Sequence, residues 1–92
     1  MKMAKQGTEE QVSYVAELMD SVIEDSSVPR NIRKALDDAK QKILSQENMD
    51  VAITSAIYIL DDISNDINMP SHARTEIWQI ISELESIREQ SK

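Results

Sequence analysis

The chain has 92 residues, a formal net charge of −7 and no cysteine. This length suits one small domain, and the missing cysteines exclude disulfides, thiolate metal sites and a cysteine nucleophile. The acidic balance argues against a general affinity for the phosphate backbone of nucleic acids, which requires clustered Lys and Arg.

Turn-forming residues are scarce, with one Gly and two Pro in the whole chain. A protein of many strands needs more of them, so the sequence predicts long helices. No apolar run approaches the roughly 20 residues that span a bilayer. The start, MKMAKQGTEEQ, lacks the apolar centre of a signal peptide. We therefore expect a cytoplasmic protein with no membrane contact.

The first helix is expected over residues 8–25. Thr8 and Gln11 have the spacing of a capping box, which is typical of a helix start. Residues 1–6 and 90–92 are predicted to be flexible tails. The apolar positions recur at helical spacing and comprise Val12, Val15, Ala16, Met19, Val22 and Ile23.

The second helix is expected over 29–45, with Pro29 in its first turn. The preceding Val28 can fold back over the new helix. Its basic face is partly balanced by acids four residues away, such as Asp37 after Arg33 and Asp38 after Lys34. The expected core positions are Ile32, Ala35, Leu36, Ala39 and Ile43.

The third and fourth helices are expected over 48–65 and 70–90. Asn48 suits the N-cap of the third helix, and Pro70 suits the first turn of the fourth, with Met69 folding back over it. The expected core positions are Ala52, Ile53, Ala56, Ile57, Leu60 and Ile63, followed by Ala73, Ile77, Ile80, Ile81, Leu84 and Ile87.

A shift of the chain against itself by 41 residues aligns its two halves. Pro29 then meets Pro70, Arg33 meets Arg74, and the apolar positions of the helices register. The acidic first and third helices would flank the basic second one, because short loops make sequential helices antiparallel neighbours. The sequence predicts a single all-α domain over 1–92, an antiparallel four-helix bundle of two tandem hairpins.

The segments DSSVPRNIRKAL and DDISNDINMPSHARTEIWQIISELESIRE resemble a family of small archaeal proteins that is known only as an uncharacterised protein family. The resemblance covers nearly the whole chain. It implies a compact domain of four helices in archaeal cytoplasm, with no established activity, cofactor or catalytic residue. The family often has a proline where this chain has Ile67.

A looser resemblance is to HEAT repeats, whose period is also near forty residues. In that pattern an Asp in the turn precedes an Arg just inside the second helix, as Asp25 precedes Arg33 and Asp66 precedes Arg74. A stack of two HEAT-like repeats is therefore the alternative architecture. Two repeats are fewer than a stable solenoid usually needs, which favours the closed bundle.

Three groups of residues suggest chemistry. His72 is the one histidine and has no second His or Cys with which to complete a zinc site; its repeat equivalent is Asn31. Asp61, Asp62 and Asp66 could hold Mg²⁺ near a helix end, although the same spacing suits a solvated turn. Arg33 and Arg74 could clamp an anion, or brace Asp25, Asp66 or the carbonyls that end the preceding helix.

Apolar residues outside the core pattern form the other candidate site. Val51 and Tyr58 lie seven residues apart on the far side of the third helix, and Trp78 lies on the flank of the fourth. Aromatic residues of this kind anchor protein interfaces. Such rings can equally cover the edge of a small bundle.

The sequence therefore predicts a non-enzymatic module for protein interaction or self-association, with a protein partner or a second copy bound through Val51, Tyr58 and Trp78. One alternative is an RNA-associated protein that uses the basic second helix, although that helix has no aromatic residue on which bases could stack. The other is a metal-binding protein or small enzyme that uses Asp61, Asp62 and Asp66. No cofactor is implied.

Overall fold

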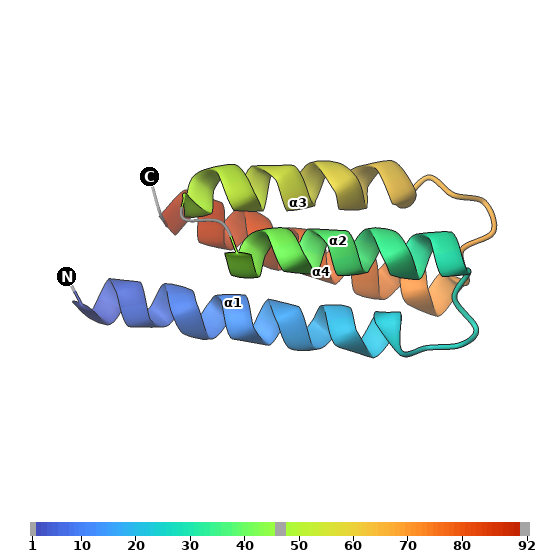
Figure 1. Cartoon of the computed structure of the whole chain (residues 1–92), viewed down its shortest axis with the longest axis horizontal. Coiled ribbons are helices and arrows are strands. Elements are labelled where there is room, and N and C mark those ends of the chain that lie inside the picture. Colours follow the sequence, from blue (N-terminus) through green and yellow to red (C-terminus); the bar gives the residue numbers. More distant parts are fainter. Residues whose placement is uncertain (1, 46–47, 91–92) are drawn as a thin grey trace.

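The computed structural model describes residues 2–45 and 48–90, with side chains from Glu10 onward. It contains helices α1 (Lys2–Ile23), α2 (Arg30–Ser45), α3 (Met49–Ile63) and α4 (Ser71–Gln90), and no strand within those ranges. The helices lie alongside one another in an elongated molecule of 43 × 20 × 19 Å (Figure 1). The chain is all-α, as predicted. None of the described helices is long and apolar enough to cross a membrane.

The helices pack in a closed ring. Helix α1 lies next to α2 and α4, and α3 lies next to α2 and α4, whereas the backbones of the diagonal pairs stay farther apart within the described ranges. Every neighbouring pair is therefore antiparallel, as in an up-down four-helix bundle. A HEAT-like stack would instead place α1 beside α3 and α2 beside α4, because equivalent helices of successive repeats lie next to each other. The HEAT-like alternative is wrong.

The core is aliphatic and lies where the helical periodicity places it. Of the predicted positions, Ile23, Ala35, Ile57, Ile63 and Ile81 are half-buried and the rest are buried. Val28 and Met69 are also buried and belong to the same core cluster. Burial of a Val, Leu or Ile side chain contributes about 1.5 to 3 kcal/mol, so these side chains are the main source of stability.

The helix boundaries differ from the prediction at two kinds of position. Helix α1 begins at Lys2, not near Thr8, so Thr8 and Gln11 lie inside a helix and do not mark its start. Pro29 and Pro70 immediately precede α2 and α4, and their carbonyls accept the first helical hydrogen bonds. Asn48 caps α3 as predicted, since its side chain accepts from the Val51 N–H. Residues 1 and 91–92 of the expected tails lie outside the described ranges.

Candidate functional site

The α1–α2 and α3–α4 loops lie at the same end of the bundle (Figure 1), and each is folded around an aspartate. The Asp25 Oδ1 atom accepts from the backbone N–H of Ser27 at 2.9 Å and from its hydroxyl at 2.6 Å. The Asp66 Oδ1 atom accepts from the backbone N–H of Asn68 at 2.8 Å. An aspartate that satisfies the backbone two residues ahead fixes a tight turn. The two loops thus share one local design.

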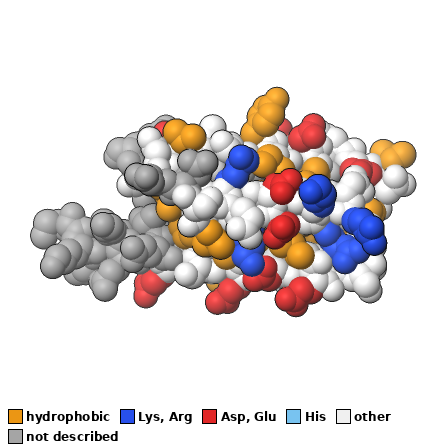
Figure 2. Space-filling model, in the orientation of Figure 1, with side chains coloured by type: hydrophobic (Ala, Val, Ile, Leu, Met, Phe, Trp, Pro, Cys, Tyr) orange, Lys and Arg blue, Asp and Glu red, His pale blue; other side chains and the backbone are white. Residues whose placement is uncertain are grey.

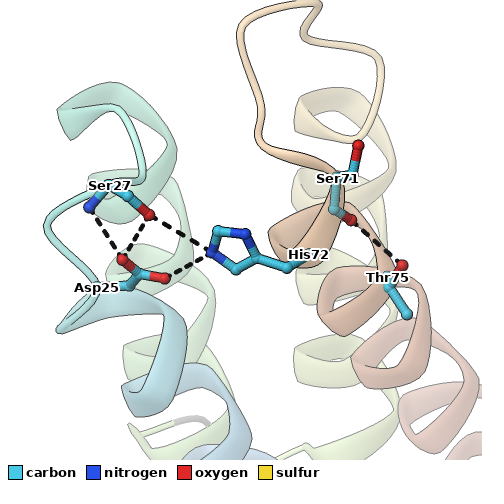
Figure 3. Close-up of polar contacts among 5 residues, drawn as sticks. All are labelled: Asp25, Ser27, Ser71, His72 and Thr75. Carbon is cyan, nitrogen blue, oxygen red and sulfur yellow. Dashed lines mark hydrogen bonds and ion pairs between the residues drawn. The ribbon is translucent and has the colours of Figure 1, made fainter.

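The second carboxylate oxygen of each aspartate contacts the other hairpin. His72, at the start of α4, places Nε2 at 2.8 Å from the Asp25 Oδ2 atom (Figure 3). Asn31, at the start of α2, donates from Nδ2 to the Asp66 Oδ2 atom at 3.3 Å. We call these two interactions the crossed loop contacts. His72 and Asn31 occupy equivalent positions under the 41-residue shift. The histidine of the second hairpin therefore makes the contact that an asparagine makes in the first.

The group of Asp25, Ser27 and His72 contains the residue types of a catalytic triad without its geometry. In a triad the carboxylate and the nucleophile contact opposite nitrogens of the imidazole. Here the Asp25 Oδ2 atom and the Ser27 Oγ atom both approach Nε2, at 2.8 and 3.4 Å. Moreover, the Ser27 hydroxyl donates to Asp25. The arrangement does not activate Ser27 as a nucleophile.

What this group does is hold a carboxylate in its ionised form. The hydrogen bond from the Ser27 hydroxyl, followed by those from His72 and the Ser27 N–H, lowers the pKa of Asp25 from 3.8 to about 2. Donors stabilise the charged form of a carboxylate and so lower its pKa. The contact with His72 becomes an ion pair when the imidazole is protonated. The α1–α2 loop and the first turn of α4 therefore meet on one charged group.

The two equivalent arginines behave differently. Arg74 donates from Nη2 to the Asp66 carbonyl at 2.8 Å, which is the kind of brace that the sequence suggests. The Arg33 side chain makes no hydrogen bond within the described part of the chain, and the Nε atoms of Arg33 and Arg74 are both buried without a partner. Nor do Arg33 and Asp37, or Lys34 and Asp38, come within ion-pairing distance there, so the expected local charge pairing of α2 is absent.

The aspartates proposed as metal ligands do not converge. Asp61 and Asp62 are exposed on α3, while Asp66 lies in the loop and faces Asn31. Across residues 2–45 and 48–90 the structure gathers no group of three or more His, Asp or Glu side chains that could hold a metal ion. The carbonyl of Asp61 accepts from the side chains of Ser64 and Asn65, which end the helix. The geometry matches the solvated turn.

A shallow groove of about 330 Å³ runs between α3 and α4. Its lining combines apolar and charged side chains: Thr54, Ile57, Tyr58, Asp61, Ile81, Glu85 and Arg88. Of the three interface candidates, Tyr58 lines the groove and is 79% exposed, Trp78 is 57% exposed and Val51 is 51% exposed. The sequence pattern placed all three outside the core, and the structure leaves them exposed.

The three candidates form a row, not a compact cluster. Val51 lies one turn before Thr54 on α3, and Trp78 lies one turn before Ile81 on α4. Because α3 and α4 run antiparallel, these residues fall beyond opposite ends of the groove, with Tyr58 between them. At 1.5 Å of rise per residue the row is roughly 20 Å long.

Sequence reasoning missed the polar margin of this groove and one ion pair elsewhere. Glu85 and Arg88 line the groove because they stand four and seven residues after Ile81 on the same side of α4. On the α1–α2 side, the Lys40 Nζ atom lies 2.6 Å from the Asp20 Oδ1 atom, which raises the pKa of Lys40. The sequence did contain a signal for this ion pair, because it places a basic second helix next to an acidic first one.

The chain is similar to known archaeal proteins over nearly its whole length. The profile of the Uncharacterised protein family (UPF0147) matches residues 1–87. A UPF0147 protein of Methanocaldococcus jannaschii is 51% identical over 81 residues, which cover 87% of each chain. One from Methanothermobacter thermautotrophicus is 48% identical over 87% of this chain and 79% of its own.

A solved structure agrees with the fold. The crystal structure of a UPF0147 protein from Thermoplasma acidophilum superposes with a TM-score of 0.80 at 38% identity, and the match covers 86% of this chain and 94% of the other. The family match at residues 1–87 takes in α1, α2, α3 and most of α4. The chain therefore belongs to the uncharacterised protein family UPF0147.

Proposed function

We propose that this protein is a cytoplasmic, non-enzymatic interaction module that binds a basic amphipathic helix of a partner protein along the α3–α4 groove. The observation that carries the proposal is the exposed Tyr58 in the lining of that groove, with the exposed Val51 and Trp78 one helical turn beyond lining residues of α3 and α4. Exposed tyrosine and tryptophan are the residue types that dominate binding energy at protein interfaces.

The shape of the groove suits a helical ligand. A helix that lies in a groove presents apolar anchors at every third or fourth position. A row of roughly 20 Å matches a helix of about 14 residues. Ile57 and Ile81 are half-buried in the lining, so they would contact such anchors while remaining part of the bundle.

The charge around the groove favours a basic ligand. Residues 48–90 contain eight Asp and Glu residues, two arginines and no lysine. Asp61 and Glu85 are exposed within the lining itself. Complementary charge at the margin of an interface accelerates binding and selects the partner. A second copy of this chain would bring a further acidic surface to the groove, whereas a helix with lysines beside its apolar stripe would be attracted.

A designed peptide tests the proposal directly. The probe is a 16-residue helix with a leucine stripe flanked by lysines, and Trp78, the one tryptophan in the chain, reports its binding by fluorescence. We expect saturable binding that Tyr58→Glu weakens by at least about tenfold, as expected for an anchor residue. The matched control is Tyr14→Glu on α1, a second exposed tyrosine outside the groove, which should change the affinity less than twofold.

Two further peptides separate the explanations. A peptide with glutamates in place of the lysines should not bind, and a scrambled lysine peptide without the leucine stripe should bind much more weakly. If the scrambled peptide binds as tightly as the peptide with the leucine stripe, charge alone explains the binding, and the proposal is contradicted. A dimer seen by analytical ultracentrifugation and abolished by Tyr58→Glu would show that a second copy occupies the groove.

A further inference from the structure

The opposite side of the molecule carries a concave surface that the proposed helix-binding groove does not use. It lies between the end of α1 and the first two turns of α2, has a volume of about 520 Å³, and is open to solvent. Its lining consists of Ile23, Arg30, Arg33, Lys34 and Asp37. Lys and Arg side chains gather over the start of α2 at the right-hand end of the face in Figure 2. We call this surface the cationic pocket.

From its composition and geometry we propose that the cationic pocket binds a single phosphate group of a small phosphorylated ligand. Arg30, Arg33, Lys34 and Asp37 recur at spacings of three and four residues, so they lie on one side of α2. The lining thus contains three cationic side chains and one carboxylate. A phosphate group has three terminal oxygens, and an arginine fork can bind two of them.

Arg33 is the residue on which the inference depends. Its equivalent, Arg74, uses its guanidinium to bond the Asp66 carbonyl. Arg33 lines the pocket, and its side chain has no hydrogen-bond partner among the described residues; its Nε atom is buried without a partner, as is the Nε atom of Arg74. A guanidinium that has lost water on one side and gained no acceptor binds an anion more readily at its remaining nitrogens. At the equivalent position of the two hairpins, the Arg74 side chain therefore braces a loop carbonyl, whereas the Arg33 side chain has no acceptor.

The lining also favours a single phosphate group over a nucleic acid strand. Binding of single-stranded RNA relies on aromatic platforms and a long basic track. No aromatic side chain lines the cationic pocket, and two carboxylates next to its lining residues in the sequence, Glu24 after the end of α1 and Asp38 on α2, are exposed. The net charge of −7 opposes a polyanion over the rest of the surface. One phosphate group can meet the three cations without approaching those carboxylates.

The test is a titration with inorganic phosphate at constant ionic strength, followed through the backbone amide signals of the ¹⁵N-labelled protein. We expect saturable shifts confined to the first half of α2 and the end of α1. Arg33→Gln should weaken binding by at least about tenfold. Lys42→Gln is the matched control, because it removes the same charge from the same helix outside the pocket, and it should change the affinity less than twofold.

Three results would overturn the proposal. One is the absence of saturation up to roughly 50 mM phosphate, well above millimolar binding. Another is equal weakening by Arg33→Gln and Lys42→Gln, which would indicate attraction to the general charge of α2. The last is an affinity for oligoribonucleotides that rises steadily with their length, because this would indicate that the surface binds a chain of phosphates and not a single one. Should Arg33→Gln fail to fold, Arg30→Gln gives the same comparison, since Arg30 is exposed at the helix start.

Discussion

Asp25 is the residue through which the loop end of the bundle is most tightly connected. One of its carboxylate oxygens orders its own loop through Ser27, and the other reaches His72 on α4. His72 lies 47 residues away in the sequence, so no local pattern could indicate the contact. The 41-residue shift pairs His72 with Asn31, yet it does not reveal that each of them crosses to the other hairpin. That result depends on how the hairpins pack.

Asp25 also makes stability depend on pH in the acid range. Its pKa is lowered from 3.8 in the unfolded chain to about 2 in the fold, so its stabilising contribution is complete above the unfolded value and is lost as the pH falls through the folded one. The free energy of unfolding, measured with urea at pH 5 and at pH 2, should therefore fall less in Asp25→Asn than in the wild type. Equal losses in the two proteins would contradict this role of the carboxylate.

Helix α2 shows how a regular element separates its core from its surface. Leu36 is fully buried, whereas Leu44 is 53% exposed on the same helix. Leu44 directly follows the buried Ile43, and consecutive helical residues point about 100° apart, so Leu44 is turned away from the core that Ile43 faces. The helix thus offers two leucines of equal chemistry in opposite surroundings.

The difference predicts two very different alanine variants. Leu36→Ala should lower the free energy of unfolding by about 2 to 5 kcal/mol, because it removes packed methyl groups and leaves a cavity. Leu44→Ala should change it by no more than about 0.5 kcal/mol. Urea unfolding followed by circular dichroism measures both. A loss in Leu44→Ala as large as that in Leu36→Ala would mean that Leu44 is covered by another molecule in solution.

The helices themselves were predictable because apolar periodicity and the two prolines act locally. Pro29 and Pro70 mark the starts of α2 and α4 to within one residue, and Asn48 marks the start of α3. The start of α1 was missed since Thr8 and Gln11 resemble a cap even though the helix continues through them. The pairing of Lys34 with Asp38 was also wrong, since both side chains are exposed and exposed charge pairs gain too little energy to fix long side chains.

At the scale of the whole molecule, neither hairpin contains a complete core. The α1–α2 hairpin packs against the α3–α4 hairpin through two helix pairs, α2 with α3 and α1 with α4. Ile32, Leu36, Ile53 and Ile77 all belong to the same buried cluster. Each half therefore depends on apolar surface that the other half provides.

Separated halves should consequently restore structure when they are mixed. Peptides of residues 1–47 and 48–92, combined at equal concentration, should give more helical circular dichroism at 222 nm than the sum of their separate spectra. Leu36→Ala in the first peptide should reduce this gain, because it weakens the shared core. The matched peptide with Leu44→Ala should not. A mixture whose spectrum equals the sum would mean that each half folds independently of the other.

The contact between α1 and α4 also determines when folding can finish during synthesis. Helix α1 is made before α4 and is its neighbour in the fold, so the apolar side of α1 has no cover on one flank until α4 has left the ribosome. Until then the α1–α2 hairpin carries exposed Val15, Met19 and Val22, which the finished bundle buries completely. Incomplete chains with such surfaces tend to aggregate. Truncation within α4 should thus harm the nascent chain at the end that was synthesised first.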